Sequence, residues 1–119
     1  MANPTVWFEV AGKDRDALKH FYSSLFDWKL ADMDEMSYTT VEASDGGIPG
    51  GIGAAPEGHG GHVTFYVQVD EIEAALARAE ELGGKRVMGP MDLPGGGQIG
   101  MFTDPEGHEI GLVRQAEQG

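Results

Sequence analysis

The feature that most constrains the fold is an order of elements that occurs twice in this 119-residue chain. In residues 6–10, Val6, Phe8 and Val10 alternate with Trp7 and Glu9, which predicts a strand with one apolar face. Residues 14–26 carry apolar side chains at helical spacing. Three short strands follow within residues 28–54, and a glycine-rich stretch occupies residues 55–61. The order then begins again, with a strand at 62–69, a helix at 70–82 and strands at 85–91, 98–103 and 109–114. The sequence therefore predicts β-α-β-β-β twice.

Each repeat has too little surface to bury a core alone, so we expect both to share one α+β domain over residues 1–119. The expected segments are a first unit at 5–54, a linker at 55–61, a second unit at 62–114 and a polar tail at 115–119. Asp14 and Asp70 precede the two helical segments and are expected to be their N-caps.

A tight turn near the end of the chain, Asp104-Pro-Glu-Gly107, joins two apolar strands. Proline pre-sets φ for such a turn, and glycine gives a permissive backbone after it. The turn resembles the closing hairpin of the vicinal oxygen chelate families, which include glyoxalase I, extradiol dioxygenases and bleomycin-resistance proteins. The motifs that add to this resemblance are Trp7-Phe-Glu-Val10, Phe21-Tyr22, Leu25-Phe-Asp-Trp28, Gly83-Gly84 and Ile110-Gly-Leu-Val113. The resemblance covers about residues 5–114. It implies a curled mixed sheet around a cavity, with the helices outside.

Period-two alternation assigns the strand side chains to faces. The apolar sets should pack under the helices: Val6, Phe8 and Val10 under the first, and Val63, Phe65, Val67 and Val69 under the second. The opposite face lines the cavity if the resemblance holds, although alternation alone leaves open that it simply meets solvent. This face carries the candidate ligand-binding residues Trp7, Glu9, His62, Thr64, Tyr66, Gln68, Glu109 and Gly111. An indole at Trp7 suits stacking on a planar or cyclic ligand, or it fills the cavity itself.

In metal-dependent members of these families, the resemblance implies His and Glu ligands from the first, fourth, fifth and last strands. Those places fall here on Trp7, near Gly51–Gly53, on Thr64 and on Gly111. At most one ligand survives, whereas catalytic zinc or iron sites need about three protein ligands. We therefore predict that the chain binds no metal and no other cofactor.

Another ligand set remains open. His62, Glu9 and Glu109 share the same predicted face and could converge there as an alternative metal site. His59, in the glycine-rich stretch, could also approach His62.

Composition excludes several functions. The chain has no cysteine, so it can form no disulfide and no thiolate site. Its net charge of -12 argues against nucleic-acid binding, which requires cations that displace phosphate counterions. No apolar run approaches the ~20 residues of a membrane span, and the N-terminus lacks a signal-peptide pattern. We expect a cytoplasmic protein that does not associate with membranes.

Two main classes of function remain, beside a structural or regulatory module whose cavity is filled by Trp7 and its neighbours. The first is a glyoxalase- or bleomycin-resistance-like protein that binds a small organic molecule, for which the acidic surface favours a cation. The second is a lyase, isomerase or dioxygenase, with a non-standard metal set or with Glu9, His62 and Tyr66 as catalytic candidates. Whether the protein is an enzyme stays open at this point. We also expect a homodimer, because members of this length usually dimerise and residues 48–53 could form an uncovered sheet edge.

Overall fold

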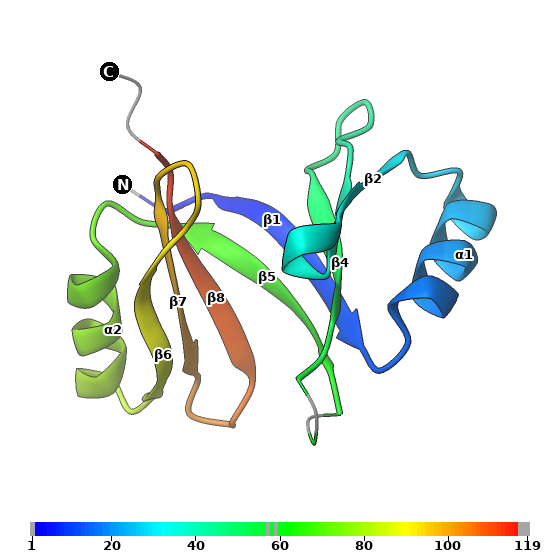
Figure 1. Ribbon diagram of the computed structural model, residues 1–119. Coiled ribbons are helices and arrows are strands. Elements are labelled where there is room, and N and C mark those ends of the chain that lie inside the picture. Colours follow the sequence, from blue (N-terminus) through cyan, green and yellow to red (C-terminus); the bar gives the residue numbers. More distant parts are fainter. Residues whose placement is uncertain (1, 57, 59, 117–119) are drawn as a thin grey trace. The chain divides into compact units, whose positions relative to one another are not determined.

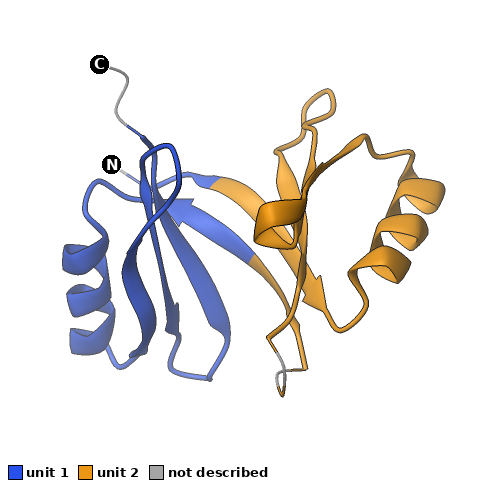
Figure 2. Ribbon diagram, in the orientation of Figure 1, with its two compact units in different colours: residues 1–5, 65–119 blue, residues 6–64 orange. Residues whose placement is uncertain are grey.

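The computed structural model describes residues 2–56, 58 and 60–116, so His59 and parts of the expected linker and tail lie outside the described residues. The chain forms two compact units (Figure 2): residues 6–64, here the N-terminal unit, and residues 1–5 with 65–119, the C-terminal unit. The elements in Figure 1 are β1 (Thr5–Gly12), α1 (Arg15–Phe26), β2 (Leu30–Met33), η1 (Asp34–Met36), β3 (Tyr38–Val41), β4 (Gly50–Ala54), β5 (His62–Gln68), α2 (Ile72–Glu81), β6 (Lys85–Asp92), β7 (Gln98–Thr103) and β8 (Glu109–Arg114). This order confirms the predicted α+β class with two tandem βαβββ units.

In the N-terminal unit, the strands are ordered β2-β3-β4-β1, with β1 and β4 parallel and the other neighbours antiparallel. α1 packs against one face, where Ile52 and Val41 are buried. Lys19 of α1 pairs with Asp32 of β2 at 2.7 Å, and the Thr39 hydroxyl donates to the same carboxylate at 2.8 Å. Asp32 therefore lies within a strand on the helix side of the sheet. The short helical turn η1 follows it from Asp34.

α1 begins as predicted but is covered less than predicted. Asp14 caps it, since the Asp14 carboxylate accepts a hydrogen bond from the Ala17 N–H at 3.0 Å. Phe21 and Leu25, however, stay 56% and 59% exposed. The helix reaches its sheet through one edge of the apolar stripe, where Tyr22 stacks on Trp28 with ring centroids 5.4 Å apart.

β4 is an inner strand, hydrogen-bonded to both β1 and β3, so the prediction of an uncovered edge at 48–53 is wrong. Pro49 lies just before β4, where a missing N–H is tolerated. The glycines of β4 are a packing requirement: a Cβ at Gly50 would collide with the Phe8 ring. The glycines that suggested an edge strand instead leave room for aromatic rings to lie across β4.

In the C-terminal unit, the strands are ordered β5-β8-β7-β6, with β5 and β8 parallel and the other pairs antiparallel. α2 covers one face, and its Ile72 and Leu76 form a buried core with Leu112 of β8. The helix ends at Glu81, and Gly83 just beyond its C-cap has a positive φ of 105°, which glycine adopts readily. A Cβ at Gly100 would lie 2.7 Å from the Ile72 side chain, so this glycine lets α2 approach β7 closely.

Two predictions about this unit are wrong. Asp70 is not the N-cap of α2, because the helix begins at Ile72 and Glu71 takes the cap position, without a side-chain cap hydrogen bond among the described residues. Val63 and Phe65 do not pack under α2: they are 77% and 42% exposed. Of the predicted set, only Val67 and Val69 pack against the core that α2 forms with β8. α2 packs mainly on β6, β7 and β8 and does not lie along the start of β5.

The turn at 104–107 is held by one side chain. Asp104 Oδ1 accepts the backbone N–H groups of Glu106 and His108 at 3.0 Å each, and Asp104 Oδ2 lies 2.9 Å from His108 Nδ1. The backbone N–H of His108, its ring and the Glu106 N–H together hold the pKa of Asp104 below its ordinary value.

This lowered pKa predicts how the turn responds to acid. A carboxylate with a depressed folded-state pKa stabilises the fold above its unfolded pKa, and that contribution disappears as the pH falls through the folded pKa. We expect carbon-13 NMR to give Asp104 a titration midpoint below that of aspartate in an unfolded peptide. Asp104→Asn, which keeps one acceptor oxygen but no charge, should be less stable than wild type at neutral pH. The gap between the two should narrow on acidification below about pH 4; a constant gap would contradict this account.

Within the described residues, neither helix has the length and apolarity that crossing a membrane requires.

Candidate functional site

The predicted site residues divide between the two units. Trp7, Glu9, His62 and Thr64 belong to the N-terminal unit, and Tyr66, Gln68, Glu109 and Gly111 belong to the C-terminal unit. In each unit, one predicted residue is paired with a glycine on the neighbouring strand: Glu9 with Gly51, and Tyr66 with Gly111. Glu9 and Tyr66 are also equivalent in the repeat, because each stands six residues before the first residue of its unit's helix.

A chain of hydrogen bonds joins three predicted residues of the N-terminal unit through one that was not predicted. The Trp7 indole N–H donates to the Tyr38 hydroxyl at 2.9 Å. The Tyr38 hydroxyl donates to Glu9 Oε1 at 2.9 Å, and Glu9 Oε2 lies 2.6 Å from His62 Nε2. The Glu9 and His62 side chains are 12% and 21% exposed. Charge-assisted contacts of this length are among the stronger hydrogen bonds in proteins, so the chain fixes the positions of Trp7 and Glu9.

Tyr38 reaches β1 because β4 carries glycines beneath it. Tyr38 pairs with Gly53 across the sheet, and a Cβ at Gly53 would lie 3.1 Å from the Tyr38 ring. A Cβ at Gly51 would collide with the Tyr38 hydroxyl. The signal that could have identified Tyr38 is this glycine pair, read together with an aromatic residue on the neighbouring strand.

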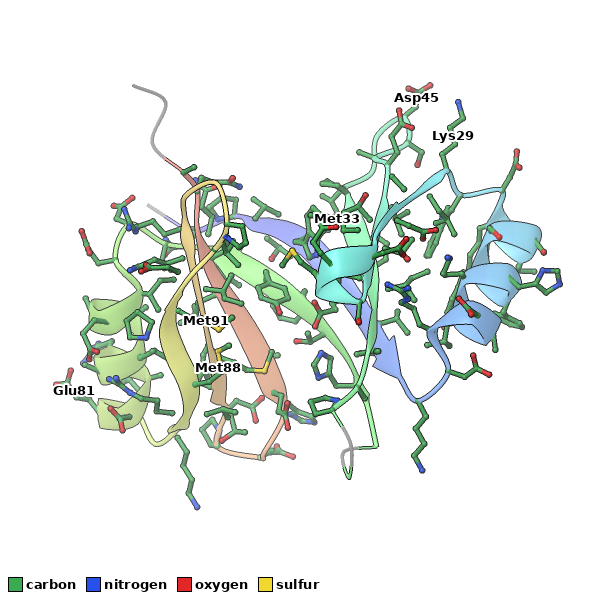
Figure 3. The ribbon with its side chains drawn as sticks, in the orientation of Figure 1. Lys29, Met33, Asp45, Glu81, Met88 and Met91 are labelled. Atoms are coloured by element: carbon green, nitrogen blue, oxygen red, sulfur yellow. The ribbon has the colours of Figure 1, made fainter. Side chains whose placement is uncertain are left out.

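A pocket of about 430 Å³ lies beside Trp7 within the N-terminal unit. Trp7 is the one predicted ligand-binding residue among those that line it; the others are Lys29, Leu30, Ala31, Thr40, Val41, Glu42, Ala43 and Pro49. Most of these side chains are apolar. One cation, Lys29, extends away from the ribbon at the start of β2 (Figure 3), and one anion, Glu42, is contributed by the segment after β3. The lining therefore suits an apolar ring with few polar substituents.

In the C-terminal unit, Tyr66 lies over Gly111. A Cβ at Gly111 would collide with the Tyr66 ring, and Tyr66 is 8% exposed. Because the Tyr66 ring packs on Gly111, no room is left for a longer side chain at position 111.

Elsewhere in this unit, Met88 and Met91 lie along β6 (Figure 3) and are paired with Met101 and Ile99 of β7.

The family's metal set does not fit these residues. Trp7 and Gly111 offer no ligating atom. The Tyr38 ring lies over the fourth-strand place, at Gly51–Gly53, and the Tyr66 ring lies over Gly111, the last-strand place. Within residues 2–56, 58 and 60–116, no group of three or more His, Asp or Glu side chains is arranged to hold a metal ion. His62 and Glu9 are brought together as a pair, and Glu109 belongs to the other unit.

Comparisons with known proteins place the chain in a wider context. A family model described as the glyoxalase/bleomycin resistance protein/dioxygenase superfamily matches residues 5–112. The anthracycline biosynthesis protein DnrV of Streptomyces peucetius is 31% identical over 127 residues, covering 92% of this chain and 46% of DnrV. The chain thus spans about half the length of the curated relatives that it matches.

Solved structures share the fold at low sequence identity. Methylmalonyl-CoA epimerase from Mycobacterium tuberculosis superposes with a TM-score of 0.69 at 15% identity, over 95% of this chain and 88% of the epimerase. A superfamily member from Vibrio splendidus gives a TM-score of 0.67 at 16% identity, over 96% of this chain and all of the other.

Proposed function

The chain belongs to the glyoxalase/bleomycin resistance protein/dioxygenase superfamily, and we propose that it binds a small planar organic molecule beside Trp7 without the metal of that superfamily. The observation that carries this proposal is the pocket of about 430 Å³ with an indole in its wall. Indole rings contribute large apolar area and favour stacked or edge-on partners. The ligand's ring lies against Trp7, beside Pro49 and Ala31 of β2.

The nature of the relatives supports a planar ligand. DnrV carries the name anthracycline biosynthesis protein, and anthracyclines have a planar system of fused rings. The pocket holds one lysine and one glutamate, so its local charge is balanced although the whole chain carries -12. The overall acidity attracts a cationic ligand at long range, and the pocket itself selects by ring shape.

The residues at the family's ligand places support binding without a metal. A divalent ion needs about three protein ligands, whereas the family's places hold Trp7 and Gly111, and a tyrosine ring lies over Gly51. The ligand is therefore held by apolar contact and hydrogen bonds.

Isothermal titration tests this function. We expect doxorubicin, as an anthracycline, and 2-naphthol, as a minimal fused ring, to bind saturably with one site per chain. Both should compete for the same site. Heats no larger than those of dilution for both compounds, at concentrations up to the millimolar range, would contradict the proposal.

The contact between Glu9 and His62 favours a second candidate function, which is proton transfer to or from the bound molecule. A carboxylate 2.6 Å from an imidazole is a plausible acid–base pair in geometric terms. Mass spectrometry of the ligand recovered after incubation in deuterated water separates the two functions. An unchanged mass supports binding alone, and incorporation of deuterium that depends on Glu9 supports the enzyme.

We also infer that the protein forms a homodimer. Because β4 is an inner strand, this inference rests on exposed apolar side chains of β5 and not on an open sheet edge. Val63 and Phe65 are apolar and exposed at 77% and 42%. A second copy of the chain would cover such side chains. Light scattering at micromolar concentration should give twice the 12.7 kDa chain mass. Val63→Lys should shift the mass toward the monomer, and Glu81→Lys on α2 should not; a monomeric wild type would contradict this inference.

A further inference from the structure

The Trp7 indole N–H is the donor in the hydrogen bond between Trp7 and Tyr38. An indole has one N–H and accepts no hydrogen bond at nitrogen, so the 2.9 Å contact with Tyr38 is a donation from Trp7. The hydroxyl proton of Tyr38 is then directed at Glu9 Oε1, also at 2.9 Å. Both bonds are within the N-terminal unit and are partly buried. Trp7 therefore has its single polar atom engaged by the protein.

The backbone beneath Tyr38 shows that this arrangement depends on particular residues. The Tyr38 ring crosses β4 over Gly51 and Gly53, where any side chain at Gly51 would collide with the hydroxyl. Gly51 is itself paired with Glu9, so the residue that makes room for Tyr38 lies beside the carboxylate that accepts from it. Few residue types satisfy all these contacts together.

We propose that Tyr38 is a positioning residue that sets the ligand specificity of the Trp7 pocket. Tyr38 engages the indole N–H, so that Trp7 presents its ring to the ligand and offers it no hydrogen bond. The pocket then selects planar aromatic rings over saturated rings of the same outline, and it is indifferent to an acceptor oxygen at the Trp7 contact. This inference rests on the proposed function for its ligand, but the hydrogen bond itself can be tested without one.

The first experiment measures the hydrogen bond in the ligand-free protein. Nitrogen-15 NMR resolves the indole N–H signals of Trp7 and Trp28, assigned with Trp28→Phe. In Tyr38→Phe, which keeps the ring over the glycines, we expect the Trp7 signal to shift upfield and its solvent exchange to accelerate at least tenfold. Tyr22→Phe removes a phenol from the aromatic cluster of α1 and is the matched control, with no effect on Trp7. Unchanged Trp7 exchange in Tyr38→Phe would overturn the proposal.

The second experiment measures specificity by titration calorimetry. Wild type should bind 2-naphthol about fivefold more tightly than decahydro-2-naphthol, since stacking adds to area burial. It should bind 2-methoxynaphthalene and 2-ethylnaphthalene, which differ by an acceptor oxygen, within about twofold of each other. Tyr38→Phe should weaken 2-naphthol several-fold and lose most of the preference for the flat ring, because the indole is no longer held.

These outcomes distinguish a failure of ligand binding beside Trp7 from a failure of the specificity role of Tyr38. If no naphthalene binds wild type, both the proposed function and the specificity role of Tyr38 fail, even if NMR shows the hydrogen bond. If wild type binds 2-naphthol, and Tyr38→Phe keeps the same affinity and the same preference, the proposed function stands and the role of Tyr38 is wrong. A preference of wild type for the acceptor-bearing methoxy compound would also overturn the proposal.

Discussion

Trp7→Ala is expected to weaken the binding of 2-naphthol and doxorubicin at least tenfold, or about 1.4 kcal/mol. The substitution removes the ring that forms one wall of the pocket together with its stacking contact. Trp7→Phe keeps an aromatic face without the N–H, so it should retain more affinity than Trp7→Ala. Titration calorimetry gives the dissociation constants for all variants.

The matched control is Trp28→Phe, because Trp28 belongs to the same unit but packs in the aromatic cluster of α1 and does not line the pocket. It should leave the affinity for 2-naphthol within about twofold of wild type. Equal affinities of wild type and folded Trp7→Ala would show that the ligand lies elsewhere. Circular dichroism of each variant verifies that the fold is intact.

Gly111→Ala is expected to destabilise the protein by about 1–3 kcal/mol, the usual range for overpacking. The added Cβ would collide with the Tyr66 ring, which is nearly buried at 8% exposure. Urea denaturation of Gly111→Ala, Tyr66→Ala and the double variant forms a cycle that isolates the collision. In the Tyr66→Ala background the cost of the alanine at 111 should fall to a few tenths of a kcal/mol, within the ordinary scatter of additive mutations.

Gly60→Ala is the control for a general effect of removing glycine, because a Cβ at Gly60 would meet no described atom within 4 Å. It should change stability by less than about 0.5 kcal/mol. A Gly111→Ala variant as stable as Gly60→Ala would mean that Tyr66 does not occupy the space above position 111. Equal costs with and without Tyr66 would assign the destabilisation to the backbone instead.

The fold was predictable because its signals are local. Alternation, helical spacing and the turn at 104–107 each depend on a few neighbouring residues, and the strands at 98–103 and 109–114 were placed without error. The errors lie where coverage depends on tertiary packing. Period-two alternation assigns Val63 to an apolar face, but whether a helix reaches that far depends on where α2 begins. Asp70 has the right chemistry for a cap and stands one residue too early.

The candidate site was predictable only in part. Trp7, Glu9 and His62 were found by their shared strand face and by the resemblance, and the structure joins them through hydrogen bonds. Tyr38 was missed because it lies 29 residues from Glu9 in the chain and reaches it over the glycines of β4. Sheet register determines such a contact, and a single sequence does not give the register of non-neighbouring strands.

Gly51 and Gly111 therefore have a packing role as well as standing at the places of missing ligands. In the sequence, Gly51 and Gly111 indicate ligands that are missing relative to metal-dependent relatives. In the structure, each makes room for a tyrosine ring, Tyr38 in one unit and Tyr66 in the other. Restoring a carboxylate at either position would require its tyrosine to move, so single substitutions should not recreate a metal site.

The most direct test of metal-free binding is one comparison of affinity, made on protein purified without a histidine tag. Titration calorimetry with 2-naphthol is carried out before and after exhaustive dialysis against a chelator, and again after addition of excess zinc or manganese. Binding beside Trp7 without a metal predicts the same dissociation constant, within about twofold, in all these conditions. Loss of binding after chelation, with recovery on addition of either metal, would contradict it.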